Sequence, residues 1–511
     1  MSQELVMGID VGTYETKGVL VNADGAVVAT EVQPHTIIFP RAGWAEHDAE
    51  GTWWGDVVTV SNALLATPGV SPTDVKGLGV SAIGPDVLPM DENFQPLRNG
   101  ILYGVDTRAV EEIAEMNERF GEDYIFNACG NALSSQATLP KILWLKKNEP
   151  EVYKKARWFV TATTFIVARL TGRVVVDHFS AGSHHPSYDP WKREWNEELN
   201  EGIVETSRLA ELAWSHEVAG GLTEWAAKET GLPEGTPVTV GTIDAGAESV
   251  SVGVTQPGEM MLMYGSTIFM IQVTDNDQAR DKRLWVAPYL FPGTWCLLAG
   301  MATSGALTRW FRDSFASELV AAEEAGGEPA YAVLSRQAGE SPPGSEGVIV
   351  LPYFSGERTP INDPRAKGMI FGLSLTHSRA DLFRATLEGM GHGIKQHVDM
   401  FTDMGAPPHS IQAVGGGTKN PVWLQIVSDI SGVPQRVAPL TVGASYGDAF
   451  LAALALGWVQ GPDAIKEWQG NGSVVTPNDQ LADTYAPLHE AYTDLYHATK
   501  ETMHKLHELG Y

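Results

Sequence analysis

The chain has 511 residues, of which 43% are hydrophobic and 19% are charged, and this composition is typical of a globular protein that folds throughout. Its length predicts two or three domains. A formal net charge of -28 at pH 7 repels phosphate backbones and anionic lipids, which argues against a nucleic-acid or membrane-surface partner. The apolar runs are shorter than the roughly 18 residues of a spanning helix.

The two cysteines, Cys129 and Cys296, lie far apart in the sequence and give neither a disulfide framework nor a metal-ligand spacing. The first residues also lack a basic start followed by an apolar signal core. We therefore expect a protein of the reducing cytoplasm.

The amino terminus is predicted to be a β-meander. Residues 5–10 are dense in apolar residues, a turn follows at Gly12 and Thr13, and residues 17–32 contain the hairpin-type pair Asp24-Gly25. Further along, residues 75–84 indicate a buried strand. Strands at this end of the chain are followed by helical patterns, which favours an α/β fold.

Two segments in the first half have helical character. Residues 109–121 are amphipathic and end at Gly121, and residues 157–172 form a helix-like apolar segment.

Residues 231–259 then place Gly and Pro on either side of a strand, and residues 260–273 begin a second meander with a glycine turn in its middle. The second half thus resembles the first.

We place the domain boundary in residues 252–258, which gives domains of residues 1–253 and 254–511. The final residues, 488–511, are predicted to form a packed terminal helix.

The stretch that holds Asp10, Gly12, Thr13 and Lys17 has the composition of an anion site. Backbone N–H groups at the turn and the Thr13 hydroxyl can converge on a phosphate, and Lys17 adds positive charge. Asp10 beside a phosphate requires an intervening cation, so the stretch predicts Mg²⁺ with retained waters. It matches neither of the two familiar nucleotide fingerprints. The alternative is an ordinary hairpin in which Asp10 caps its own turn.

Two more stretches place polar or glycine residues at strand ends. Residues 415–417 are three glycines between a short strand and a helix whose first turn holds Asn420 and Pro421, which suits a base or a phosphate. The alternative is a tight strand-to-helix turn. Asp244 follows an apolar strand among small residues and is a candidate general base, with a helix N-cap as its alternative.

Several motifs together resemble the FGGY carbohydrate kinases, which belong to the actin, hexokinase and heat-shock chaperone ATPase superfamily. The resemblance spans nearly the whole chain, and five motifs carry it in order: GIDVGTYETK, AGWAEHDAEGTWW, ATLPKILWLKKNEP, LPYFSGERTPINDPRAKGMIFGLSLTHSRADLFRATLEG and GGGTKNPVWLQIVSDISGVP. It implies two ribonuclease H-like domains, with mixed sheets flanked by helices and an active-site cleft between them.

The resemblance also implies roles for single residues. Asp10 would serve the metal, and Asp244 would be the catalytic base. The nucleotide-binding residues that it implies are Gly12, Thr13, Lys17, Ser266, Thr267, Gly305, Arg309, Gly415, Gly416, Gly417 and Asn420.

The sequence departs from the family pattern where specificity is set. Xylulokinases usually show Gln-Met-His-Gly where this chain has Ile-Gly-Pro-Asp, ending at Asp86, and the Arg-Glu pair of glycerol kinases is missing. Asp106 and Arg108 keep an Asp-x-Arg pattern, in which Asp106 can accept from two hydroxyls. We expect Asp86, Asp106, Arg108 and Asp244 to bind substrate. The alternative for Asp106 and Arg108 is a buried structural pair.

Trp44 could stack on a sugar, but core packing is the favoured interpretation, since the chain has 15 tryptophans. The histidines lack metal-ligand spacing. Ser378, with Asp381 three residues later, predicts a helix start that serves as scaffold.

The function expected is transfer of the γ-phosphate of ATP, with Mg²⁺, to a hydroxyl of a small sugar, a ketopentose such as D-xylulose first. The alternatives are a kinase of a four- or five-carbon polyol, a nucleotide-gated sugar sensor of the same fold, and an uncoupled ATPase or phosphatase of the superfamily. The expected partners are the sugar or polyol and, as one option, a second copy in a homodimer.

Overall fold

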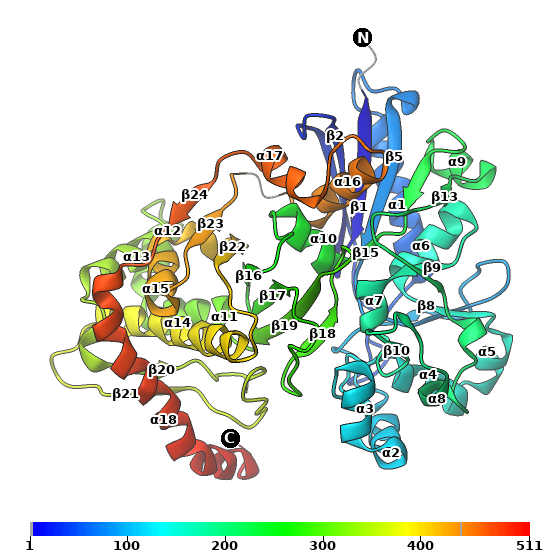
Figure 1. Ribbon diagram of the computed structural model, residues 1–511. Coiled ribbons are helices and arrows are strands. Elements are labelled where there is room, and N and C mark those ends of the chain that lie inside the picture. The colour runs from blue at the N-terminus through cyan, green and yellow to red at the C-terminus, as the bar shows by residue number, and fades with distance from the viewer. Residues whose placement is uncertain (1–3, 440–441, 511) are drawn as a thin grey trace. The chain divides into compact units, whose positions relative to one another are not determined.

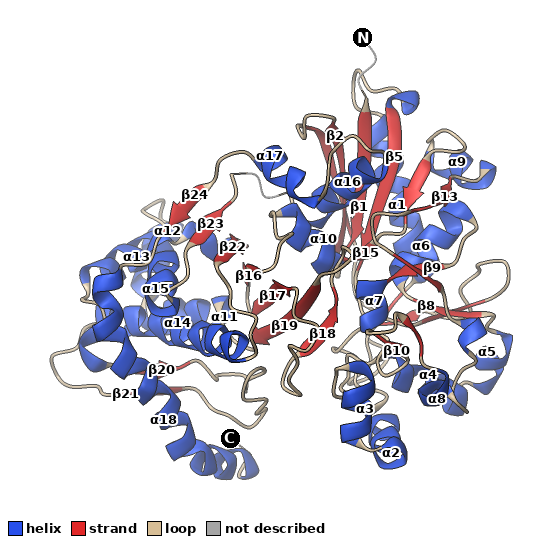
Figure 2. Ribbon diagram, viewed as in Figure 1, coloured by secondary structure: helices blue, strands red, loops and turns tan. Residues whose placement is uncertain are grey.

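The structure is a computed structural model that describes residues 4–439 and 442–510. It consists of two compact units. Unit 1 comprises Met1–Gln256, Arg280–Cys296 and Leu440–Gly470, and unit 2 comprises Pro257–Ala279, Leu297–Pro439 and Asn471–Tyr511. Each unit has a mixed sheet flanked by helices (Figure 1, Figure 2), as expected for an α/β fold. Because each unit draws on separate stretches of chain, the expected boundary after residue 253 stays a prediction.

The main sheet of unit 1 has the strand order β13-β14-β5-β1-β2-β3, and β15 pairs with β5. β1 runs antiparallel to β2 and parallel to β5, which confirms the predicted meander and the buried strand. The strands of this sheet are β1 (Leu5–Val11), β2 (Glu15–Asn22), β3 (Val27–Pro34), β5 (Val75–Ala82), β13 (Val218–Gly221), β14 (Pro237–Thr239) and β15 (Thr242–Ile243).

Helices flank this sheet, and loops connect them (Figure 2). The helices of unit 1 are α1 (Gly55–Leu65), α2 (Val110–Phe120), α3 (Glu122–Cys129), α4 (Thr138–Asn148), α5 (Pro150–Lys155), α6 (Ala162–Thr171), α7 (His178–Gly182), α8 (Glu197–Asn200), α9 (Glu224–Thr230), α10 (Asp244–Ser251), α16 (Ala444–Ala455) and α17 (Ile465–Gln469). Its short strands are β4 (Glu46–His47), β6 (Leu88–Met90), β7 (Gly100–Ile101), β8 (Trp158–Val160), β9 (Val175–Asp177), β10 (Tyr188–Asp189), β11 (Glu194–Trp195), β12 (Glu211–Ala213) and β18 (Trp285–Pro288).

The predicted helix that closes at Gly121 is confirmed as α2, and Gly121 has a φ of 87°. The segment 157–172 was predicted as one helix-like element and is instead β8 followed by α6. The break comes at Thr161, whose hydroxyl accepts a hydrogen bond from the backbone N–H of Thr164 and so starts a new helix.

Helix α16 lies directly on the backbone of the sheet, because glycines face it. A Cβ on Gly8 of β1 would come within 1.9 Å of the Ser445 carbonyl oxygen, and a Cβ on Gly79 of β5 within 2.0 Å of the Asp448 carbonyl oxygen. Gly447 brings α16 equally close to α10, since its Cβ would lie 2.0 Å from the Ala247 carbonyl oxygen. Larger side chains at these points would push the helix away.

Unit 2 has a sheet in which the strand order includes β19-β17-β16-β22-β23-β24. The second predicted meander is confirmed as β16 and β17. The strands are β16 (Glu259–Tyr264), β17 (Ile268–Thr274), β19 (Trp295–Met301), β20 (Ile349–Leu351), β21 (Met369–Phe371), β22 (Ser410–Val414), β23 (Gln435–Val437) and β24 (Ser473–Val475). The helices are α11 (Gly305–Phe315), α12 (Ser317–Glu324), α13 (Ala330–Glu340), α14 (Arg379–Asp403), α15 (Pro421–Ser431) and α18 (Ala482–Glu508).

The predicted helix start at Ser378 is confirmed, since Ser378 and Asp381 form a capping box at α14. Short single-turn segments complete the two units. They are a π-helical turn at Ala49–Trp54 and 3-10 turns at Pro72–Asp74, Thr206–Arg208, Ser345–Gly347, Gly416–Lys419, Pro462–Ala464 and Asp479–Leu481.

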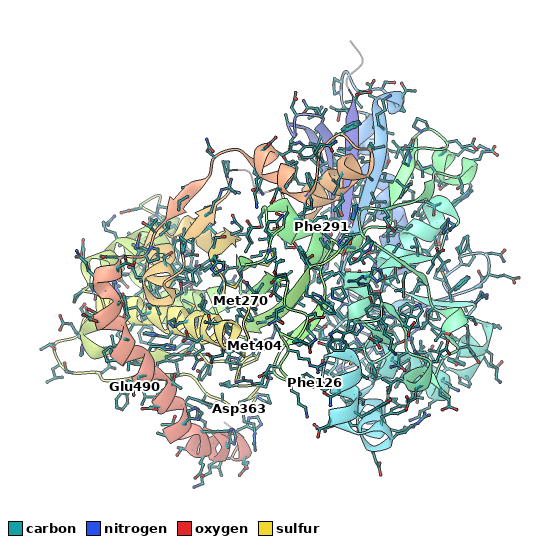
Figure 3. All side chains as sticks on the ribbon, viewed as in Figure 1. Phe126, Met270, Phe291, Asp363, Met404 and Glu490 are labelled. Carbon is teal, nitrogen blue, oxygen red and sulfur yellow. The ribbon has the colours of Figure 1, made fainter. Side chains whose placement is uncertain are left out.

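The terminal helix predicted over residues 488–511 is α18, which begins earlier, at Ala482, while residue 511 lies outside the described residues. It packs through Tyr492 and Tyr496 against the hydrophobic core of β20. Asp363, labelled in Figure 3, accepts hydrogen bonds from the Tyr496 hydroxyl at 2.9 Å and from His504 at 2.7 Å. Over the described residues, no helix is long and apolar enough to cross a bilayer.

Candidate functional site

The carboxyl end of β1 carries Asp10, which is 7% exposed. The strand register places it opposite Lys17 on β2 and opposite Ser81 on β5. The Ser81 hydroxyl oxygen lies 3.1 Å from Asp10 Oδ1. Burial and, after it, the charge of Asp244 raise the pKa of Asp10 well above its usual range. Asp10 therefore bonds to Ser81 on the neighbouring strand β5. In the alternative interpretation, Asp10 would only cap its own turn.

The turn after Asp10 is tight. The Gly12 N–H donates to the Glu15 carbonyl at 3.0 Å, and a Cβ on Gly12 would come within 3.1 Å of that oxygen. Lys17 pairs with the Glu15 carboxylate at 2.8 Å. Burial lowers the pKa of Lys17, but the bond with Glu15 and the charges of Glu15, Asp10 and Glu248 together outweigh burial, so the net shift is upward. Lys17 is thus a cation, held beside this turn.

Asp244 is the first residue of α10 and is partly exposed. Its Oδ1 accepts the backbone N–H of Ala245 at 2.7 Å. Loss of solvation raises the pKa of Asp244 to about 7; the bond from Ala245 opposes this, and the charges of Glu248 and Asp86 add to it. A carboxyl with a pKa near neutrality is suited to accept a proton at physiological pH.

Two acidic residues near Asp244 were not among the sequence-based candidates. Glu248 lies one helical turn further along α10, and burial raises its pKa. Asp448 lies on α16 with 0% exposure, and its Oδ2 is 2.7 Å from the Ser81 hydroxyl oxygen. A signal for Asp448 was present in the sequence, because it is the only charged residue in the helix ASYGDAFLAALA.

These acids outnumber the cations near them. After burial, the charges of Asp244 and Glu248 raise the pKa of Asp10, and Lys17 is the cation that lowers it. In residues 4–439 and 442–510, no three His, Cys, Asp or Glu side chains form a complete metal cage. This donor set fits Mg²⁺, which usually keeps several waters and binds one or two carboxylates together with substrate phosphates.

Asp86 is completely buried in unit 1. Its Oδ1 accepts the backbone N–H of Ala162 at 2.8 Å, while Oδ2 has no hydrogen-bond partner among the described residues. Burial raises the pKa of Asp86 to about 8, although the bond from Ala162 and the charge of Lys141 lower it. An unpaired buried carboxyl oxygen costs free energy unless a ligand or water bonds to it.

Asp106 and Arg108 form a buried pair, which was the structural alternative. The Arg108 Nε lies 2.9 Å and 3.0 Å from the two Asp106 oxygens, and Nη2 reaches Asp106 at 2.7 Å and Glu46 at 2.8 Å. Both side chains are 0% exposed. Their contact with substrate stays a prediction.

Trp44 packs among charged and aromatic side chains. The guanidinium groups of Arg41 and Arg108 lie 3.6 Å and 4.0 Å from its ring centroid, and the ring of Trp144 lies edge-on at 5.0 Å. This packing favours the core interpretation of Trp44.

In unit 2, the turn between β16 and β17 meets the start of α11. The Gly305 N–H donates to the Gly265 carbonyl at 2.9 Å, and the Ser304 N–H donates to the Ser266 carbonyl at 3.0 Å. A Cβ on Gly305 would lie 2.5 Å from the Gly265 oxygen, so only glycine allows this contact. Thr267 ends the same turn and lies next to β17.

The glycine cluster packs against the same turn. Gly415 has a φ of 92°, and its Cβ would come within 2.7 Å of the Tyr264 carbonyl oxygen. Asn420 caps α15, where its side chain accepts the backbone N–H groups of Val422 and Trp423, each at 3.1 Å. Asn420 is therefore an N-cap residue as well as a nucleotide-binding candidate.

Most of the nucleotide-binding candidates line a cavity of about 900 Å³ in unit 2. Five candidates besides Ser266 line it: Gly305, Arg309, Gly416, Gly417 and Asn420. The sequence-based candidates missed three further lining residues, Tyr331, Ser335 and Phe383, because nothing in the local pattern of α13 and α14 marks them. Gly12, Thr13 and Lys17 belong to unit 1.

Two family models match the chain. The N-terminal domain of the FGGY family of carbohydrate kinases matches residues 5–250, and the C-terminal domain of that family matches residues 260–456. The chain is 27% identical over 499 residues to the xylulose kinase of Bacillus subtilis (strain 168), covering 97% of each chain. It is 29% identical over 497 residues to the xylulose kinase of Escherichia coli (strain K12), covering 96% of this chain and 98% of that one.

A crystal structure is similar over nearly the whole chain. The xylulose kinase from Rhodospirillum rubrum superposes with a TM-score of 0.91 at 30% identity, covering 98% of this chain and 100% of that one. The fold is thus the expected one of the actin and hexokinase type, and the class is an ATP-dependent sugar kinase, a phosphotransferase with an alcohol group as acceptor. Within this class, the chain belongs to the FGGY family of carbohydrate kinases.

Proposed function

We propose that the chain transfers the γ-phosphate of ATP to a hydroxyl of a ketopentose, with D-xylulose as the first candidate. The names of the relatives support the substrate class. The observation that carries the proposal is Asp244, a partly exposed carboxyl at the start of α10 whose pKa is raised to about 7. A module that only binds sugar has little need of such a base.

In this mechanism, Asp244 accepts the proton of the attacking hydroxyl. The sugar oxygen forms a bond to the γ-phosphorus, the bond from that phosphorus to the β-bridging oxygen breaks, and ADP leaves with the electron pair. The protein otherwise positions the groups and balances their charge. The Asp244 carboxyl is held in place for this task by the bond from the Ala245 N–H.

We assign the cavity of unit 2 to the nucleotide. The glycines Gly416 and Gly417 line this cavity and would let the protein backbone approach the adenosine, with Gly415 next to them in the chain. Ser266, Gly305, Arg309 and Asn420 would supply further contacts, and Thr267 lies next to Ser266. In unit 1, Gly12, Thr13 and Lys17 would bind phosphate, and Asp10 would hold Mg²⁺. The metal supplies charge neutralisation for the phosphates when it is bound.

Asp86 is the substrate-binding residue that the geometry favours most. Its Oδ2 is buried without a partner among the described residues, and its charge acts on Asp244. A sugar hydroxyl that donates to this oxygen would satisfy it. Asp106 and Arg108 are proposed to bind substrate as well, with their buried pair holding both side chains in place.

The test is a screen of ADP release across pentuloses, hexuloses and polyols with the wild type, the Asp244→Asn variant and the Glu248→Gln variant as a matched control. Asp244→Asn should lower kcat by about 10²-fold to 10⁴-fold, the usual contribution of a general base, and keep ATP binding. An unchanged kcat for Asp244→Asn contradicts the mechanism.

Each alternative leaves its own signature in this screen. A higher kcat/KM for polyols than for ketopentoses would favour a polyol kinase. Sugar binding without ADP release would favour a sensor, and ADP release that no acceptor changes would favour an uncoupled ATPase.

The remaining proposals concern surroundings and assembly. Cys129 and Cys296 are both free and buried, which supports the reducing cytoplasm as the location. The exposed Phe371, Leu373 and Leu375 of unit 2 form apolar surface of the kind that a homodimer would cover. Analytical ultracentrifugation of the wild type and of Leu375→Asp tests this assembly. We expect a dimer for the wild type and a monomer for Leu375→Asp, and a monomeric wild type would contradict the proposal.

A further inference from the structure

Asp448 is held rigidly beside the site, although it belongs to a different stretch of chain from Asp10 and Ser81. It lies on α16, whose backbone touches β1 and β5 at Gly8 and Gly79. Its side chain is 0% exposed, and its Oδ2 contacts the Ser81 hydroxyl. Any role of this carboxyl therefore acts through the groups that it touches.

The group that it touches is the hydroxyl of Ser81. This oxygen lies 2.7 Å from Asp448 Oδ2 and 3.1 Å from Asp10 Oδ1, so two carboxyl groups share one hydroxyl. A serine hydroxyl has a single proton to donate and accepts through its lone pairs. Both contacts are hydrogen bonds only if one of the two carboxyl groups is itself the donor.

The surroundings decide which carboxyl is the donor. Asp448 Oδ1 has no hydrogen-bond partner in the part of the chain that the structure describes, and its carboxyl is sealed from solvent. Asp10 keeps some exposure and pairs in register with the cationic Lys17. The deeper burial of Asp448 favours the neutral acid there, which leaves Asp10 as the acceptor.

We propose that Asp448 is a positioning residue of the kinase, which acts on Asp10 through Ser81. The Asp448 acid donates to Ser81 Oγ, and the Ser81 hydroxyl donates to Asp10 Oδ1. This chain of bonds fixes the rotation of the Asp10 carboxylate and leaves its Oδ2 free for the waters of Mg²⁺. The inference rests on the proposed role of Asp10.

The test compares Asp448→Asn, Asp448→Ala and Ser81→Ala. An amide N–H can donate to Ser81 as the acid does, so Asp448→Asn should stay within about threefold of the wild type in kcat. Asp448→Ala and Ser81→Ala should each raise the Mg²⁺ concentration for half-maximal rate by about tenfold, since one hydrogen bond to a charged group is lost. The KM for the sugar should not change.

A binding measurement without turnover separates positioning from folding. Electron paramagnetic resonance of Mn²⁺ with ADP should show weaker Mn²⁺ binding for Asp448→Ala and Ser81→Ala and wild-type binding for Asp448→Asn. Asp74→Ala is the control. Asp74 is a buried carboxyl of unit 1 that accepts the backbone N–H of Ser71 and contacts neither Ser81 nor Asp10. Asp74→Ala should lower the free energy of unfolding and leave Mn²⁺ binding as it is.

Three results would overturn the inference. Asp448→Ala and Ser81→Ala with wild-type Mn²⁺ binding would show that Asp448 has no influence on Asp10. If Asp448→Asn binds Mn²⁺ as weakly as Asp448→Ala does, the Asp448 carboxyl does not act as a hydrogen-bond donor. If Asp10→Asn binds Mn²⁺ as tightly as the wild type, the proposed role of Asp10 is wrong and this inference fails with it. If Asp10→Asn binds Mn²⁺ weakly while Asp448→Ala and Ser81→Ala bind it normally, only the role of Asp448 is wrong.

Discussion

Glu248 lies four residues after Asp244 on α10, so the two carboxyl groups face the same side of the helix one turn apart. Burial is the main cause that raises the pKa of Asp244 to about 7, and the charge of Glu248 adds to it. The base of the proposed reaction is thus adjusted by a residue with no assigned contact to substrate.

The pH dependence of kcat should follow Asp244. Only the ionised carboxyl accepts a proton, so kcat should be level above a pH of about 7 and fall tenfold for each unit below it. Glu248→Gln removes one charge that raises this pKa, and the fall should then begin at lower pH. Rates at saturating sugar and ATP between pH 5 and 9 measure both profiles. A kcat for the wild type that is equal at pH 5 and pH 8 contradicts the assignment.

The glycine cluster of unit 2 offers a matched pair of substitutions. A Cβ on Gly417 would lie 2.7 Å from the Trp423 ring and 2.8 Å from the Tyr264 Cβ, whereas a Cβ on Gly416 would meet nothing within 4 Å. Gly417→Ala should therefore lower the free energy of unfolding by about 1–3 kcal/mol through overpacking. Gly416→Ala should keep the stability and raise the KM for ATP, because its methyl group enters the proposed nucleotide cavity.

Urea unfolding and titration with ATP measure the two effects of this pair separately. If Gly416→Ala and Gly417→Ala lose equal stability, Gly417 is not packed against Trp423 and Tyr264 more tightly than Gly416 is. A wild-type KM for ATP in Gly416→Ala would remove Gly416 from the proposed contacts.

The buried pair of unit 1 predicts a large cost for a small change. Asp106→Asn leaves the charge of Arg108 without its main partner at 0% exposure, and breaking a buried pair in this way costs about 3–5 kcal/mol. Glu224→Gln is the control, because Glu224 pairs with Lys228 on the surface and such pairs contribute about 0–1 kcal/mol. Chemical denaturation measures both. If Asp106→Asn instead keeps its stability and loses affinity for the sugar, Asp106 binds substrate directly.

The contact of α16 with the sheet predicts a position-specific effect within β5. Gly79→Ala places a methyl group 2.0 Å from a main-chain carbonyl oxygen, which cannot move without shifting the helix. Gly77→Ala first meets the end of the Leu456 side chain, at 3.0 Å, and its nearest main-chain atom, the Pro237 carbonyl oxygen, is 3.7 Å away. We expect Gly79→Ala to lower the midpoint of thermal unfolding by several degrees more than Gly77→Ala, by scanning calorimetry. Equal midpoints would show that α16 does not rest on the strand backbone.

The sequence was sufficient for elements whose signal is local. The two meanders, α2 and the capping box of α14 follow from apolar patterning, turn residues and side-chain caps, which lie within a few residues of each other. The break between β8 and α6 was missed because both elements are buried and apolar, so periodicity does not separate them.

Long-range relationships in the site could not be predicted in this way. Ser81 and Asp448 are separated by 367 residues and meet only because glycines let α16 approach the sheet. A single acid in an apolar helix was visible in the sequence, but its partner was not. The lining of the unit 2 cavity by Tyr331 and Phe383 depends in the same way on packing between helices.

The position of α16 has a consequence for dissecting the protein. Unit 1 takes Leu440–Gly470 from near the end of the chain, and α16 covers Gly8 and Gly79 of the central strands. A fragment that stops at residue 253 would lack this cover and would expose apolar residues that the intact protein buries. Such a fragment should aggregate when expressed alone and regain solubility when residues 440–470 are supplied as a second polypeptide or are fused to its end.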